Sequence, residues 1–168
     1  MEGLQRYTSQ RMSEATEATV MIFEVKTVDQ LRELQNILES FYKILPYKED
    51  IDGFRKNWLP TWKKLIETKS GKIFALEKDE KIIGALGFFI TPAVEDGALC
   101  CTEAFWYVHE DHRGRGIKIL NKFEDYAKSI GCKRIAMVHL ENSMPEKLKK
   151  LYTRKKYKHI ESMYLKEL

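Results

Sequence analysis

Residues 108–120, VHEDHRGRGIKIL, join a β-like run to a helix-like run across two glycines and two arginines. The first turn of an α-helix carries amide hydrogens without a partner inside the helix, and the aligned peptide dipoles add about half a positive charge there. Gly114 and Gly116 would let the backbone approach an oxyanion closely, while neighbouring arginines and a lysine add charge. The junction therefore predicts a phosphate-binding site, with a basic connector that binds no ligand as the alternative.

The spacing of these glycines is not that of two common nucleotide sites. The junction matches neither GxxxxGK(S/T), which cradles the phosphates of nucleoside triphosphates, nor GxGxxG, which binds dinucleotides. Nothing in it argues for a nucleoside triphosphatase or a Rossmann-type site.

The composition indicates a mild preference for anionic partners. The 29 lysines and arginines outnumber the 25 aspartates and glutamates, which gives a formal net charge of +4, and both signs are scattered along the chain. The densest basic run, 148–158, is typical of a solvated helix face, with a nucleic-acid-binding surface as the alternative.

Membrane, metal and disulfide signals are all missing from the sequence. No run approaches the ~20 apolar residues of a membrane span, and the start lacks the apolar core of a secretion signal. The three cysteines form neither a CxxC pair nor a zinc-like spacing with histidine. We therefore expect a soluble, cytoplasmic protein with no metal site and no structural disulfide.

Hydrophobic periodicity separates a polar segment, 1–18, from a single domain, 19–168. We expect the first to be a flexible tail and the second to be long enough to bury a core of its own. The expected strands are 20–25, 72–77, 81–91, 98–108, 134–140 and 157–168, and the expected helices are 28–45, 52–70, 117–130 and 145–156.

Local signals mark the helix ends. Thr27 and Gln30 form a capping box at the start of the first helix, and Pro46 ends it. Pro60 interrupts the second helical region, whose two tryptophans at helical spacing either belong to the core or floor a substrate pocket.

The order of elements predicts the sheet. A strand, a helix and a strand follow one another from 99 to 140, and such crossovers join parallel strands. We therefore expect a single-domain mixed α/β (α+β) fold, with a mostly antiparallel central sheet, parallel fourth and fifth strands, and flanking helices.

The segment WYVHEDHRGRGI, with its following amphipathic helix, resembles motif A of the GNAT superfamily of acyl-CoA-dependent N-acyltransferases. Arg113 and Gly116 match the family signature, whereas Lys118 stands where a small residue is usual. The resemblance covers 20–168, because the expected order of elements is also that of the family, and it implies acetyl-CoA as co-substrate.

The resemblance also implies which residues bind the cofactor. Tyr107 and Val108 occupy the end of the strand whose backbone pairs with the pantetheine arm in this family. The loop that follows would hold the pyrophosphate. Its residues are Arg113, Gly114, Arg115, Gly116, Ile117 and Lys118.

Acetyl transfer from a thioester to an amine requires a base for the protonated amine and an acid for the leaving thiolate. Glu103 is the only charged residue in the run LCCTEAFWYV, and strict alternation puts it on one face with Cys101, Phe105 and Tyr107. A carboxylate on that strand resembles the general base of some family members. The alternative is an outward-facing glutamate without a catalytic role.

The acid candidate is Tyr152. The run LYTRKKYK resembles the family segment LYxKxGF or LYxKxGY, whose first tyrosine lies beside the thioester sulfur, although Lys156 stands where glycine is usual. A structural tyrosine that caps the core is the alternative. The resemblance also makes Asn142 a candidate cofactor contact.

These features together predict an N-acetyltransferase that moves an acetyl group from acetyl-CoA to a primary amine by direct attack in a ternary complex. A catalytically inactive CoA-binding protein and a nucleic-acid-binding module are the alternatives. A thiol nucleophile at Cys101 with His109 or His112 is disfavoured, because a cysteine inside an apolar strand usually behaves as a small hydrophobe. The expected partner is a small-molecule or peptide amine acceptor, with a homodimer left open.

Overall fold

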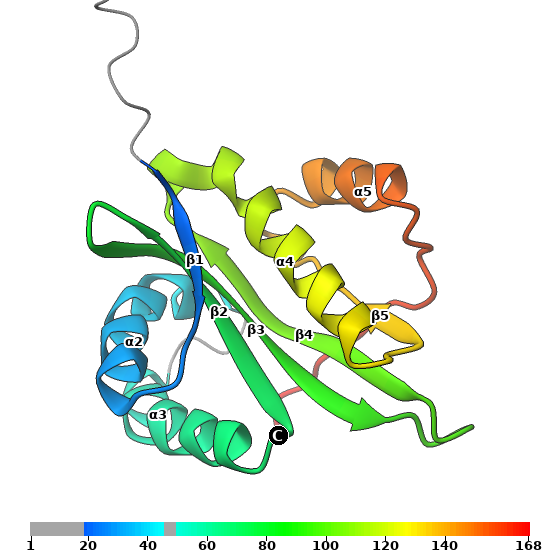
Figure 1. Cartoon of the computed structure of the whole chain (residues 1–168), viewed down its shortest axis with the longest axis horizontal. Helices are drawn as coiled ribbons and strands as arrows, with labels where there is room; N and C mark the ends of the chain where they lie inside the picture. Colours follow the sequence, from blue (N-terminus) through cyan, green and yellow to red (C-terminus); the bar gives the residue numbers. More distant parts are fainter. Residues whose placement is uncertain (1–18, 46–49) are drawn as a thin grey trace, which may run out of the picture.

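The computed structural model of the chain describes residues 19–45 and 50–168 and folds them around one mixed sheet (Figure 1). The strands lie in the order β1-β2-β3-β4-β5, with antiparallel pairs up to β4 and a parallel pair between β4 and β5. The predicted fold class and the parallel fourth and fifth strands are confirmed. The predicted tail, 1–18, lies outside the described residues.

The elements of the described part are β1 Met21–Glu24, α2 Val28–Tyr42, α3 Ile51–Glu67, β2 Gly71–Lys78, β3 Lys81–Pro92, β4 Leu99–Val108, the 3₁₀ turn η1 Glu110–Arg115, α4 Gly116–Ser129, β5 Arg134–Ala136 and α5 Pro145–Arg154. In Figure 1, α2 and α3 lie on one side of the sheet, and α4 and α5 lie on the other.

The first helix begins as predicted. The hydroxyl of Thr27 accepts a hydrogen bond from the Gln30 amide, and the Gln30 side chain accepts one from the Thr27 amide. Helix α2 ends at Tyr42, and the predicted stop at Pro46 lies outside the described residues.

The predicted interruption at Pro60 is wrong, because α3 continues from Ile51 to Glu67. A proline inside a helix removes one hydrogen bond and costs about 3 kcal/mol. Here the aromatic rings on both sides of Pro60 pack against the sheet. Trp58 and Trp62 each contact Phe105, with ring centroids 6.2 and 5.4 Å away. This burial offsets the cost and favours the core role of the tryptophans.

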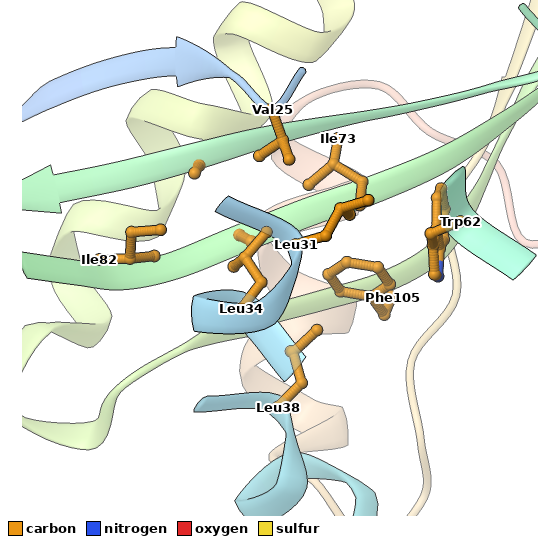
Figure 2. Close-up of a cluster of buried hydrophobic side chains, with 10 residues drawn as sticks. Val25, Leu31, Leu34, Leu38, Trp62, Ile73, Ile82 and Phe105 are labelled. Atoms are coloured by element: carbon orange, nitrogen blue, oxygen red, sulfur yellow. The ribbon is translucent and has the colours of Figure 1, made fainter. Parts of the chain in front are cut away.

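Each face of the sheet has its own core. Under α2 and α3 lies a cluster shown in Figure 2, whose labelled members are Val25, Leu31, Leu34, Leu38, Trp62, Ile73, Ile82 and Phe105. Under α4 lies a second cluster, in which the helix contributes Ile119, Leu120, Phe123 and Ala127. The periodic apolar stripe of α4 therefore packs on the sheet as an amphipathic helix should.

A β-bulge in β4 corrects one prediction. Gly87 of β3 pairs with Phe105, but the next residue, Phe88, pairs with Glu103, so Ala104 has no opposite residue. One extra residue reverses the alternation of faces beyond it. Cys101 therefore belongs to the cluster under α4, whereas Phe105 belongs to the cluster under α2 and α3. The expected shared face is wrong.

The C-terminal part of the sheet is shorter than predicted. Strand β5 covers 134–136 rather than 134–140, and residues 157–168 form no strand. Three ladder pairs join β5 to β4, so β5 offers only a short edge to a further strand. The apolar side chains of Ile160, Met163 and Tyr164 are accordingly exposed in this segment.

Candidate functional site

The two parallel strands part after three residue pairs. β3 accompanies β4 from Leu99 to Val108, whereas β5 pairs with it only from Cys100 to Thr102. Along 103–108, β4 thus has a strand on one side only within the described part of the chain. Backbone N–H and C=O groups on such an edge can pair with an extended ligand.

Glu103 lies where the strands part. Its half-buried side chain reaches toward the segment that continues β5, and its Oε2 accepts a hydrogen bond of 3.0 Å from the Val138 amide. Burial raises the pKa of Glu103 to about 7, although the bond from Val138 opposes this shift. A carboxyl group that titrates near neutral pH suits a general base.

Tyr152 approaches the same peptide segment from α5. Its side chain is 8% exposed, and its hydroxyl donates a hydrogen bond of 2.9 Å to the Val138 carbonyl oxygen. Burial raises the pKa of the Tyr152 phenol, and the nearby Glu103 carboxylate raises it further. The phenol therefore keeps its proton at neutral pH, as a proton donor must. Sequence reasoning missed Val138, because a backbone contact depends on no particular side chain.

Lys156 maintains the turn that follows Tyr152. The Tyr157 amide bonds the Tyr152 carbonyl at 2.9 Å, and the Lys156 amide bonds the Thr153 carbonyl at 3.0 Å, which together form a Schellman motif. Lys156 takes a left-handed φ of 67°, a conformation that favours glycine. The departure from the family pattern thus keeps the turn but adds backbone strain.

The two glycines of the junction differ in their surroundings. A Cβ at Gly114 would have no neighbour within 4 Å, whereas a Cβ at Gly116 would lie 3.2 Å from both Trp106 and Val108. Gly116 has a helical φ of −59°, and Gly114 also lies outside the left-handed region. Gly116 therefore lets the start of α4 pack closely on β4, and Gly114 leaves open space on the outer side.

The start of α4 carries positive charge and no side-chain cap. The helix has no side-chain N-cap hydrogen bond and no acidic residue in its first turn. Arg113 and Lys118 are exposed, and Arg115 is half-buried. The Arg113 Nη1 lies 3.7 Å from the Met144 sulfur, at the beginning of α5. This combination can bind an anion.

Beneath the junction, the buried indole Nε1 of Trp106 has no hydrogen-bond partner within the described residues. A buried donor without a partner is uncommon in proteins, and functional sites are one place where it occurs. Trp106 belongs to the 103–108 part of β4 and lies beside Gly116, at the start of α4. No sequence motif had marked Trp106 as a site residue.

The remaining predicted contact residues are Tyr107, Asn142 and Ile117. Tyr107 points to the α2 side, where its hydroxyl lies 3.1 Å from that of Ser40 and its ring packs on Phe41. The Asn142 amide donates to the Ile44 carbonyl oxygen at 2.6 Å. Asn142 thus ties the segment before α5 to the end of α2. Exposed Ile117 follows Gly116 in the first turn of α4.

Metal and membrane features give no further candidates. Among the described residues, no group of three or more His, Cys, Asp or Glu side chains could hold a metal ion. None of the helices in residues 19–45 and 50–168 is both long and apolar enough to cross a membrane.

The sequence profile of the Acetyltransferase (GNAT) family matches residues 31–157, which is most of the chain. No curated protein sequence matches it. The matched range includes the β4 edge, the junction and α5.

Solved structures share this fold. A ribosomal-protein-alanine N-acetyltransferase from Brucella melitensis biovar Abortus is 20% identical, with a TM-score of 0.68 over 89% of this chain and 99% of that one. A putative acetyl transferase from Pyrococcus furiosus is 19% identical, with a TM-score of 0.71 over 89% and 100%. An aminoglycoside N-acetyltransferase, AAC(6')-Iy in complex with CoA, is 12% identical, with a TM-score of 0.70 over 92% and 97%.

Proposed function

Because the chain belongs to the GNAT acetyltransferase family, we propose that it transfers an acetyl group from acetyl-CoA to a primary amine by direct attack in a ternary complex. The acceptor is a small-molecule or peptide amine. Acetyl-CoA supplies the acetyl group as a thioester, which needs no covalent enzyme intermediate.

The residues around the junction fit coenzyme A. The one-sided edge of β4 from 103 to 108 would hydrogen-bond the amides of the pantetheine arm. The loop from Arg113 to Lys118 and the uncapped start of α4 would bind the pyrophosphate, with Gly114 giving the closest approach. The partnerless Trp106 Nε1 supports a ligand site at this place.

Glu103 would accept the proton that the amine loses. An alkylammonium group has a pKa near 10, so a base near pH 7 has to remove its proton before attack. The carboxyl pKa of about 7 matches this task. Tyr152 would donate its phenolic proton to the departing thiolate, and for this its hydroxyl would turn away from the Val138 carbonyl, which accepts its hydrogen bond in this structure.

One observation carries the proposal: Glu103 and Tyr152, from two different elements, hold the N–H and the C=O of the same residue, Val138, where β4 and β5 part. This arrangement brings a base and an acid to one end of the open strand edge.

Replacement of the phenol tests the proposal. A panel of amines is first screened for thiol release from acetyl-CoA, which separates an enzyme from an inactive CoA-binding protein. Tyr152→Phe should then lower kcat by about 10²–10⁴ while acetyl-CoA affinity in calorimetry stays nearly constant.

Tyr157→Phe is the matched control for that experiment. Its hydroxyl bonds Glu124 on α4, with an O···O distance of 2.8 Å, and its ring lies 5.5 Å from that of Tyr152. This variant should keep most of its activity. A Tyr152→Phe protein with wild-type kcat would contradict the acid role.

A further inference from the structure

Two thiols outside the proposed chemistry lie side by side. The Sγ atoms of Cys101 and Cys132 are 3.0 Å apart, and both cysteines are free. Cys101 is fully buried in β4, opposite Ile135 of β5. Cys132 is half-buried and follows α4.

The backbone holds Cys132 in this place. Helix α4 ends in a Schellman motif, in which the Cys132 amide bonds the Ala127 carbonyl at 3.0 Å and the Gly131 amide bonds the Lys128 carbonyl at 3.0 Å. Gly131 has the left-handed φ of 78° that this motif requires. The ordered end of α4 therefore fixes the Cys132 thiol against β4.

Cys132 also lines a cavity of about 340 Å³ at the ends of α4 and α5. Five of the residues around it are cationic: Lys128, Lys133, Arg134, Lys155 and Lys156. Glu124 pairs with Lys155, and Asp96 pairs with Arg134. The other three lysines have no ion pair within the described part of the chain, so the cavity favours an anionic reagent.

We propose that Cys101 and Cys132 form a reversible disulfide, and that an anionic low-molecular-weight disulfide entering through the basic cavity oxidises them. The Cys132 thiolate attacks one sulfur of the reagent, which gives a mixed disulfide and releases one thiol. Cys101 then loses its proton and attacks the Cys132 sulfur, which releases the second thiol. Two electrons and two protons pass from the protein thiols to the reagent.

The order of attack follows from the two environments. Burial raises the pKa of the Cys101 thiol, and its hydrogen bond with Cys132 raises it further, so Cys101 is the poorer first nucleophile. Its position next to Cys132 makes the second attack intramolecular, which compensates for low thiolate content. The two sulfur atoms must move closer by about 1 Å to reach a normal bond length.

Oxidation of the full chain with glutathione disulfide tests the pair. A Cys100→Ser background is the matched control, because Cys100 neighbours Cys101 but donates to the Ala98 carbonyl instead. Intact-mass analysis should show the loss of two hydrogens, reversed by dithiothreitol, and peptide mapping should join Cys101 to Cys132. The melting temperature should rise by about 5–10 °C on oxidation, because the bond closes a long loop of the unfolded chain.

Single variants test the order. Cys101→Ala should accumulate one glutathione on Cys132, whereas Cys132→Ser should leave Cys101 unmodified. Two free thiols in the Cys100→Ser protein after oxidation, or a disulfide only between molecules, would overturn the proposal. A glutathione on Cys101 but none on Cys132 would also overturn it. These readouts use no acetyltransferase activity and are independent of the proposed function.

Discussion

The two halves of β4 differ in how many strands flank them. From Cys100 to Thr102 the strand has β3 on one side and β5 on the other, whereas from 103 to 108 it has β3 alone. The bulge at Ala104 lies just beyond the change. The first half therefore closes the sheet, and the second leaves one backbone edge without a strand partner among the described residues, where we propose that a ligand binds. One strand can thus support the fold and expose a backbone edge, provided that the neighbouring strand ends after a few residue pairs.

Glu103 lies at the border between these two parts of β4, and its replacement should change stability the most. Burial raises the pKa of Glu103 from the 4.5 of an ordinary glutamate to about 7, so the native protein binds the proton more tightly than the unfolded chain. The stability that protonation contributes is present below pH 4.5 and is lost as pH rises through 7. The amplitude is at most about 3 kcal/mol.

Glu103→Gln should remove this loss, so its free energy of unfolding should exceed that of the wild type most clearly above pH 7. Urea unfolding from pH 4 to 8 measures the difference. Glu141→Gln, at a side chain that is 82% exposed, is the control. The same substitution should lower kcat/KM, with partial recovery as pH approaches the pKa of the amine. A stability profile parallel to that of the wild type would contradict the raised pKa of Glu103.

The second comparison separates the two glycines beyond the open half. Gly116→Val would press methyl groups against Trp106 and Val108 and should lower the free energy of unfolding by about 1–3 kcal/mol. A Cβ at position 114 would have no neighbouring atom within 4 Å, so Gly114→Val should leave stability nearly unchanged but should weaken CoA binding at least about tenfold. Thermal unfolding and calorimetry measure the two quantities. Equal CoA affinity in Gly114→Val and the wild type would count against Gly114 as the place of closest approach.

The smallest effect is expected at Lys156. Glycine relieves the strain of φ 67° in the Schellman turn, so Lys156→Gly should raise the free energy of unfolding by up to about 1 kcal/mol. Lys155→Gly, one position earlier, is the contrasting variant, because Lys155 has a right-handed φ of −82° and an ion pair with Glu124. It should destabilise the protein. Stabilisation by Lys155→Gly instead would refute the assignment of the strained position.

Sequence patterns predicted the local and strongly periodic features. The capping box at Thr27 and the apolar stripe of α4 depend on residues three or four apart, so their signals are contained in short segments. The βαβ crossover also followed from the order of elements, because its topology has strong steric preferences.

Features that depend on distant contacts were missed or predicted wrongly. The bulge at Ala104 depends on the register with β3, and the unbroken α3 depends on the packing of Trp58 and Trp62 against the Phe105 ring of β4. The resemblance supplied Glu103 and Tyr152 as candidates, but their shared partner, Val138, is a backbone contact between three segments. No short sequence pattern encodes a contact between segments so far apart in the chain.

Amide hydrogen exchange, measured residue by residue with and without CoA, tests the use of the open β4 edge most directly. We expect CoA to slow exchange at amides on the open side of 103–108 and in the junction from Arg113 to Lys118. Amides of Cys100 to Thr102, already between two strands, should change little. Binding of CoA without added protection along 103–108, or with protection confined to another edge of the sheet, would contradict the account.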